Sequence, residues 1–199
     1  MTHLHLAASN FTGRIPSEIS YLSKLVTLRL SSGMTYEKST IDTLSMKRIA
    51  QNLTTLEVLS LDLVDMSSVV PDSFLNLSSS LISLSLQNCN LRGKFPETIF
   101  HLPNLEELDL GQNTNLTGST PKSNWSSPLN SLQLSSTKIS IDLHFLTSNL
   151  KSLRVLFLRE CNFPGSHLEF SGNLTQLRQL DLAGNSFRGQ IPWWSLLKP

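Results

Sequence analysis

The chain of 199 residues is rich in leucine and serine and poor in charge, which excludes several classes of protein. Leucine occupies 39 positions and serine 31, whereas charged residues make up 16% of the chain and leave a net charge of +1. This balance does not favour nucleic acid as a partner. The hydrophobic content of 39% is too high for a disordered chain. No apolar run approaches the roughly 18 residues of a membrane-spanning helix, so we expect no membrane span in this chain.

A Leu-x-Leu pattern recurs along nearly the whole chain. The first leucines of successive pairs are separated by 24, 31, 25, 24, 24, 24 and 24 residues. They are Leu4, Leu28, Leu59, Leu84, Leu108, Leu132, Leu156 and Leu180. A regular period of this length is typical of a solenoid, in which each repeat buries its apolar face against its neighbours. We predict a single array of about eight repeats over residues 1–199.

Each repeat combines a strand pattern with a helical one. Leucines two positions apart point to one side of a short strand, and strands of successive repeats stack into a parallel sheet. An upstream pair three apart, such as Leu102 and Leu105, suits a short helical or 3-10 segment on the opposite side. The strand side is the narrower one, so the stack curves. The predicted fold is an α/β solenoid, a right-handed horseshoe with a concave parallel β-sheet and a convex helical side.

The second half of several repeats carries a further motif. Residues 9–16, 89–96 and 185–192 share the form Asn/Cys/Ser-x-apolar-x-Gly-x-apolar-Pro. Glycine permits the tight bend after the strand, and proline sets the entry into the helical segment. The asparagine position turns inward, where Asn113 and Asn185 are expected to hydrogen-bond backbone carbonyl groups of adjacent coils.

The second repeat is the longest, with an insertion over residues 31–51. Ile41, Leu44 and Ile49 have roughly helical spacing, which predicts a convex-face helix with Ser39 or Thr40 as its cap. The alternative is a disordered loop. Two later repeats have Ile141-Asp142 and His167-Leu168 in place of Ile-Pro.

The Gly-x-Ile-Pro segment within a 24-residue unit resembles plant extracellular leucine-rich repeats, over about Thr2 to Trp194. Residues 76–110 and 172–192 resemble plant receptor-like proteins of the disease-resistance type. The resemblance implies a leucine-rich-repeat solenoid that binds a peptide or protein at the extracellular face of the plasma membrane. It also implies immune or developmental signalling through a partner receptor kinase. Members carry a signal peptide, cysteine-paired caps and a membrane span. We expect a fragment of an ectodomain, since none of these is found here.

Other interpretations remain open at this stage. A secreted inhibitor of a pathogen wall-degrading enzyme uses the same scaffold, and a truncated, non-functional duplicate would show the same repeats.

The sequence motifs do not indicate enzyme chemistry. No histidines pair at positions i and i+4, and the partial P-loop pattern of residues 184–189 continues with Gln190-Ile191 where Lys-Ser/Thr is required. We expect no catalytic activity, cofactor or metal.

The predicted binding residues lie on the outward-facing positions of the strands. An outward column beside the anchor leucines forms an extended polar surface, suited to a peptide or protein ligand. Phe157 is the exposed aromatic anchor of this surface, flanked by Val155 and Arg159. The predicted ligand-binding residues are Arg29, Asp109, Gln133, Val155, Phe157 and Arg159.

Six Asn-x-Ser/Thr sequons predict N-glycosylation and a secretory route. They begin at Asn10, Asn52, Asn76, Asn115, Asn124 and Asn173. Asn52, Asn76 and Asn173 directly precede a leucine of the upstream region, outside the concave strand. Glycans at these three positions would solvate the flank or back of the solenoid and leave the sheet open.

The two cysteines are predicted to be free. Cys89 and Cys161 each follow the second leucine of a strand by three positions, and 72 residues separate them, which is three repeats of 24. Three strand spacings place them about 14 Å apart, whereas a disulfide requires Cα atoms within about 7 Å. We predict two buried thiols that donate to neighbouring carbonyl groups in the position of the inward asparagine.

Overall fold

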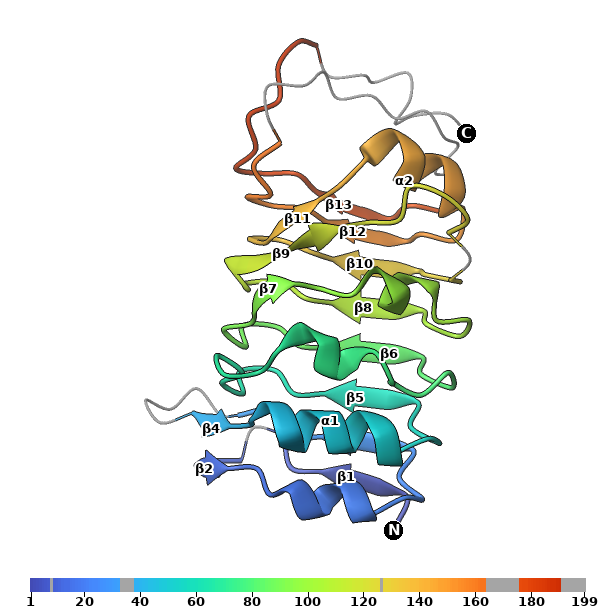
Figure 1. Ribbon diagram of the computed structural model, residues 1–199. Helices are drawn as coiled ribbons and strands as arrows, with labels where there is room; N and C mark the ends of the chain where they lie inside the picture. The colour runs from blue at the N-terminus through green and yellow to red at the C-terminus, as the bar shows by residue number, and fades with distance from the viewer. Residues whose placement is uncertain (8, 33–37, 126, 164–175, 191–199) are drawn as a thin grey trace.

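A computed structural model of the chain describes residues 1–7, 9–32, 38–125, 127–163 and 176–190. Successive coils stack along one axis, each adding a strand to an eight-stranded parallel sheet (Figure 1). In sheet order the strands are β1 (His3–His5), β3 (Thr27–Arg29), β5 (Val58–Ser60), β6 (Ser83–Ser85), β8 (Glu107–Asp109), β10 (Ser131–Gln133), β12 (Val155–Phe157) and β13 (Gln179–Asp181). The predicted solenoid is confirmed.

The register of this sheet follows the leucine period. The eight first leucines pair with one another across every strand of the sheet. The central ones, such as Leu84 and Leu132, are fully buried, whereas Leu4 and Leu180 in the outermost strands are half-buried. The outermost strands have a neighbouring strand on one side only, so the core opens toward the ends of this sheet.

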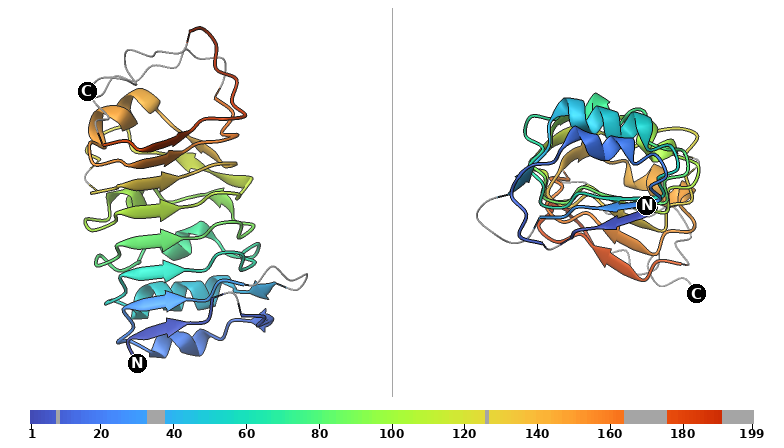
Figure 2. Two further views of the ribbon diagram at one scale, coloured as in Figure 1. Left: turned by 180° about the vertical axis from the view of Figure 1, so that it is seen from behind. Right: turned by 90° about the horizontal axis from the view of Figure 1, so that it is seen from below.

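The helical segments lie on the side opposite the sheet, as Figure 2 shows along the stack. They are η1 (Ser17–Tyr21), α1 (Thr43–Asn52), η2 (Pro71–Phe74), η3 (Glu97–His101) and α2 (Leu143–Asn149). None of the helices in the described ranges is both long and apolar enough to cross a bilayer.

The helix expected in the insertion is confirmed as α1, but its predicted cap is wrong. Asp42 caps the helix, because its Oδ1 accepts a hydrogen bond of 2.8 Å from the Ser45 amide. Ser39 and Thr40 instead form strand β4 (Ser39–Thr40), whose backbone groups bond to the neighbouring coils. An N-cap directly precedes the first helical residue, which is Thr43, so Ser39 and Thr40 lie too early in the chain to cap α1.

Both α-helices of the described chain follow an aspartate, which stands where other coils have the proline of the repeat motif. Asp142 caps α2 as Asp42 caps α1, with Oδ1 accepting from Phe145 N at 2.9 Å. Coils that have Pro16 or Pro96 at the same place form 3-10 turns without a side-chain cap. Proline carries no polar side-chain group to cap the helix, whereas aspartate satisfies a free amide of the first turn.

A second set of short strands follows the turn on one flank. β7 (Arg92–Lys94), β9 (Asn115–Ser119) and β11 (Lys138–Ser140) form a parallel sheet, and β2 (Gly13–Arg14) pairs with β4. The sequence motif predicted only a bend here. Gly13 and Gly93 have φ of +86° and +88°, the left-handed region that favours glycine.

Aromatic side chains fill the core between the sheet and the helical side. The ring of Phe95 lies 5.7 Å from that of Phe74 and 6.3 Å from that of Phe100, centroid to centroid. Trp125 continues the row, 5.5 Å from Phe100, with the rings nearly perpendicular. All four rings are buried, so they connect successive coils where the leucines do not reach.

Candidate ligand-binding face

The outward residues of the sheet form the expected column. Pairing places Arg29 beside Ser60, and the column continues through Ser85, Asp109, Gln133, Phe157 and Asp181. The strands cross this face one above another (Figure 2). A ligand that follows the column therefore meets one side chain from each coil.

A hollow of about 260 Å³ lies on this face, over β3 to β10. Three predicted binding residues, Arg29, Asp109 and Gln133, line it. The other lining residues are Ser60, Asp62, Ser83, Leu84, Ser85, Glu107, Leu108 and Ser131. Val155, Phe157 and Arg159 are not among its lining residues, so the structure divides the predicted site into two parts.

Asp62 organises the wall of the hollow, although it was not among the predicted binding residues. Its Oδ1 accepts hydrogen bonds from Ser85 Oγ at 2.6 Å and from the Gln87 amide at 2.9 Å. Its Oδ2 accepts from Ser60 Oγ at 3.0 Å, and Ser60 also contacts the Ser31 hydroxyl. These contacts bury Ser60, although it lies in the outward column. Asp62 lies two residues after Ser60 and so faces the same side of the sheet, and this position was the sequence signal that could have identified it.

Asp109 is a half-buried carboxylate of the hollow, as is Asp62. Its Oδ1 accepts from the Gly111 amide at 2.8 Å. Burial raises the pKa of Asp109 to about 6; the Gly111 hydrogen bond opposes this rise and the nearby Asp62 charge adds to it. Glu107 lies on the same strand and accepts from Ser83 Oγ at 3.0 Å. Within the described chain, no group of three or more His, Cys, Asp or Glu is placed to hold a metal ion.

The raised pKa of Asp109 predicts a pH-dependent gain in stability from Asp109→Asn. The folded state binds this proton more tightly than the unfolded state, whose aspartate titrates near pH 3.9. Wild-type stability therefore falls as pH rises from about 4 to 6 and stays lowered above that. Asp62, Glu107 and Arg29 are the other charged groups of the hollow. Urea titrations should show the variant more stable by about 1–2 kcal/mol at pH 7.5 and little changed at pH 4. Equal effects at both pH values would contradict this assignment.

The predicted aromatic anchor lies further along the sheet. Phe157 and Val155 are half-buried on β12 rather than fully exposed. Arg159 is exposed, and its Nε lies 4.0 Å from Asp181 Oδ2. On the neighbouring strand β13, Asp181 is the register partner of Phe157.

Both cysteines are unpaired, and they occupy the inward position as expected. Cys89 Sγ donates to Leu61 O at 3.1 Å, and Cys161 Sγ to Leu134 O at 3.3 Å. Cys89 is fully buried, but Cys161 is only half-buried, which corrects the expectation that both would be buried. Burial raises the pKa of both thiols, that of Cys161 to about 11.

Thiol counting tests this arrangement. We expect two free thiols per chain after denaturation without reductant, because Cys89 and Cys161 lie three coils apart. In the native protein Cys161 should be alkylated faster than Cys89, since it is more accessible and its thiol pKa is raised less. A count of zero, with a crosslinked peptide in the digest, would contradict the register of the solenoid.

Five of the six sequon asparagines lie in described parts of the chain and are exposed. They are Asn10, Asn52, Asn76, Asn115 and Asn124. Asn52 ends α1 and Asn76 follows η2, both on the helical side and away from the hollow. Asn115 begins β9 and accepts a hydrogen bond from Lys138 at 3.3 Å. Asn173 lies outside the described residues.

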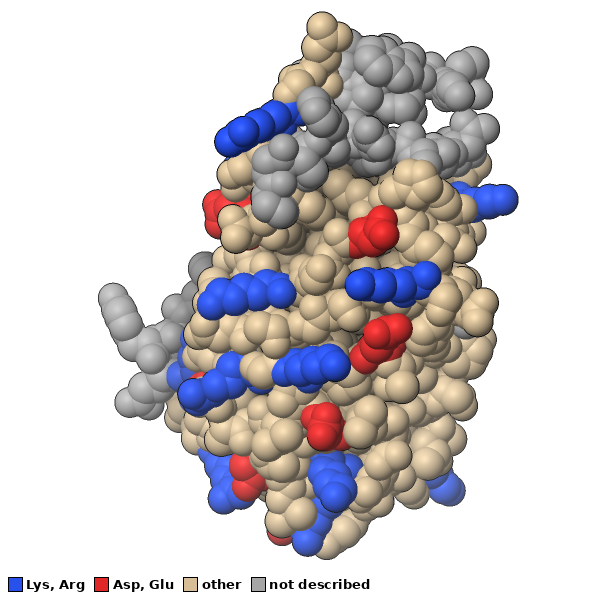
Figure 3. All heavy atoms as spheres, turned by 45° about the horizontal axis from the view of Figure 1, so that its top comes forward, with Lys and Arg blue, Asp and Glu red and all other residues tan. Residues whose placement is uncertain are grey.

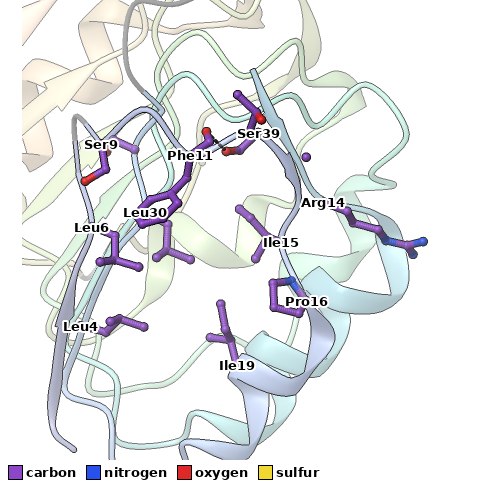
Figure 4. A pocket seen from close by; sticks show the side chains of 13 residues that line it. Leu4, Leu6, Ser9, Phe11, Arg14, Ile15, Pro16, Ile19, Leu30 and Ser39 are labelled. Carbon is purple, nitrogen blue, oxygen red and sulfur yellow. Dashed lines mark hydrogen bonds between the residues drawn. The ribbon is translucent and has the colours of Figure 1, made fainter. Parts of the chain in front are cut away.

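A second hollow opens at the N-terminal end of the array and is apolar (Figure 4). Leu4 and Leu6 of the first coil face Ile15 and Ile19 across it, and Phe11 lies at its rim with 59% of its surface exposed. It is the open end of the hydrophobic core, because β1 is an edge strand.

Charged side chains of both signs are dispersed over one further face of the molecule. Figure 3 shows Lys and Arg interspersed with Asp and Glu on the face turned toward the viewer.

The parallel sheet and its leucine register define a leucine-rich-repeat array. The family model described as Leucine Rich Repeat matches residues 80–102 and 176–196. In structure, the chain superposes on the Arabidopsis receptor kinase HAESA, solved with the peptide hormone IDA and the co-receptor SERK1, with a TM-score of 0.75 and 26% identity. That alignment covers 96% of this chain and 30% of HAESA. A TDR receptor aligns with a TM-score of 0.76 and 28% identity, over 94% of this chain and 31% of that one.

Sequence relatives narrow the class. Receptor-like protein 6 of Arabidopsis thaliana is 36% identical over 162 residues, which is 80% of this chain and 16% of the relative. Receptor-like protein Cf-9 of Solanum pimpinellifolium is 38% identical over 141 residues, 70% of this chain and 16% of the relative. The chain belongs to the plant leucine-rich-repeat receptor-like proteins. It spans about a sixth of the length of these relatives.

Proposed function

We propose that this chain is a ligand-binding part of the extracellular domain of a plant receptor-like protein. In this proposal the ligand is a peptide or protein, bound on the outward face of the eight-stranded sheet. The hollow over β3 to β10 carries the proposal, because it gathers polar and charged side chains from five successive coils. A rigid concave surface of this kind binds an extended partner without reorganising.

The relatives support a signalling role at the cell surface. HAESA was solved with a peptide hormone and a co-receptor, and the curated relatives are named receptor-like proteins. By this likeness the protein acts at the extracellular face of the plasma membrane, in immune or developmental signalling, with a receptor kinase as partner. The exposed sequon asparagines on the helical side agree with a secretory route, since glycans there leave the sheet face open.

Binding of a synthetic peptide library to the immobilised chain tests this proposal. For this experiment the chain is produced by secretion from plant cells. The probes are dodecapeptides of varied sequence. Gln133→Ala and Phe157→Ala should each weaken the selected peptides about tenfold, because both residues lie in the outward column. Lys94→Ala, an exposed change on the β7 flank, is the control and should leave binding intact. Selected peptides that bind all three variants equally would place the ligand elsewhere.

The stability of Phe157→Ala provides a separate check on the register. The ring is half-buried, so its truncation should lower the free energy of unfolding by about 1 kcal/mol. A loss of more than about 3 kcal/mol in a denaturant titration, typical of fully buried phenylalanine, would show that Phe157 belongs to the core.

A further inference from the structure

The charge on the sheet face changes sign along the column of outward residues. Arg29, on β3, is exposed, and no ion pair or hydrogen bond engages its guanidinium group within the described residues. Three carboxylates, Asp62, Glu107 and Asp109, line the same hollow. One unpaired cation therefore shares the hollow with three carboxylates: Asp62 lies one coil away, just after β5, and Glu107 and Asp109 lie three coils away on β8.

The carboxylates are not equivalent as partners for a ligand. Both oxygens of Asp62 are already hydrogen-bonded, to Ser85, Gln87 and Ser60. Asp109 accepts a single hydrogen bond on Oδ1, from Gly111, and no hydrogen bond from the described residues reaches its other oxygen. Because Asp109 also lies in the column of Arg29, it is the carboxylate best placed to receive a cation.

The register sets the distance between the two charges. From β3 to β8 the column crosses three strand spacings, through Ser60 and Ser85. At about 4.8 Å each this is about 14 Å, the length of roughly four residues of extended peptide. The serines between Arg29 and Asp109 are small, so a peptide backbone can pass over them.

We infer that the hollow selects a peptide segment running across the strands, with an acidic group at Arg29 and a basic group about four residues away at Asp109. This inference rests on the proposed function and specifies its ligand. A partially desolvated ion pair at each end favours the matching peptide, and like charges at either end repel the wrong one. Ser85 and Gln133 supply neutral contacts beside the two charges.

A designed peptide set tests the two-charge requirement. The probes are dodecapeptides of Ser and Gly, acetylated and amidated to remove terminal charges, with one Asp and one Lys separated by one to eight positions in both orders. Wild-type chain should bind those with a spacing of three to five at least tenfold more tightly than those with a spacing of one or eight. Peptides with two Asp or two Lys residues should bind as weakly as the uncharged parent.

Variants assign each charge to its residue. Arg29→Ala should remove the preference for Asp while keeping that for Lys, and Asp109→Asn should do the reverse. Asp109→Lys should prefer peptides with two acidic groups. Lys94→Ala on the β7 flank and Glu97→Gln on the helical side remove charges of the same signs away from the hollow, and both should bind as wild type does. Thermal unfolding of each variant verifies that it is folded.

The outcomes separate this inference from the proposed function. If library peptides bind through Gln133 and Phe157 but show no charge pair, or if the preferences persist in Arg29→Ala and Asp109→Asn, the charge assignment is overturned and peptide binding stands. If no peptide of either set binds, both are overturned.

Discussion

Replacing Asn113 with alanine is expected to lower the free energy of unfolding by about 3–5 kcal/mol. The side chain is fully buried, and its Oδ1 accepts from the amides of Cys89 and Leu91, both at 3.0 Å. Its Nδ2 donates to Leu86 O and Leu110 O, both at 2.8 Å. Alanine leaves these backbone groups of two coils unsatisfied in the core, and each buried unpaired group costs about 1–3 kcal/mol. Urea denaturation followed by circular dichroism measures the loss.

Asn185→Ala is the matched control for this experiment. Asn185 makes three of these four contacts, accepting from the Cys161 amide and donating to Leu158 O and Leu182 O, and it is only half-buried. Water can replace part of its hydrogen bonding, so its loss should cost less than half as much as that of Asn113. Equal costs would contradict the view that burial, rather than the hydrogen bonds alone, sets the effect.

Phe95→Ala is expected to cost about 3–5 kcal/mol, in the range of fully buried phenylalanines. The ring is 1% exposed and lies between those of Phe74 and Phe100, so its removal leaves a cavity between neighbouring coils. Phe95→Leu should recover more than half of this loss, because the leucine refills most of the space. The free energy of unfolding from denaturant titration distinguishes the two variants.

Phe11→Ala is the corresponding surface control. Phe11 is 59% exposed at the open N-terminal end, so its removal should change stability by less than about 1 kcal/mol. A cost for Phe11 equal to that of Phe95 would mean that another element covers the apolar hollow in solution. A small cost for Phe95 would show that the aromatic row does not connect the coils.

Whatever binds the sheet face meets a surface whose shape the backbone largely determines. Every coil contributes one outward side chain to the central column, and the coils are joined by backbone hydrogen bonds on both sides of the sheet residues. Side-chain substitution in the column therefore changes the chemistry of the face without moving its neighbours. This is the physical reason for expecting the Arg29 and Asp109 variants to remain folded.

The sequence by itself determined the repeat and what lies inside it. Because side chains alternate along a strand, the leucine period predicted the buried leucines and the outward column through Arg29 and Asp109, while the motif of the second half of the repeat predicted the inward place of Asn113. The bend at the glycines and the helix of the insertion were predictable because each depends on residues within one repeat. The cap of that helix was missed, because two serine or threonine residues nearby offered the same chemistry as Asp42.

The tertiary structure alone decided how residues of different coils meet. Asp62 bonds to Ser85 of the next coil, and the predicted site is divided between the hollow and Phe157. Both features depend on how side chains of separate coils lie across the sheet, which the pattern within one repeat does not encode. The raised pKa of Asp109 comes from burial by neighbouring coils and from the Asp62 charge, both set by stacking. For the same reason Cys161 is half-buried while Cys89, at the same place in its repeat, is buried completely. A repeat specifies direction for each side chain, but only the assembled stack specifies its surroundings.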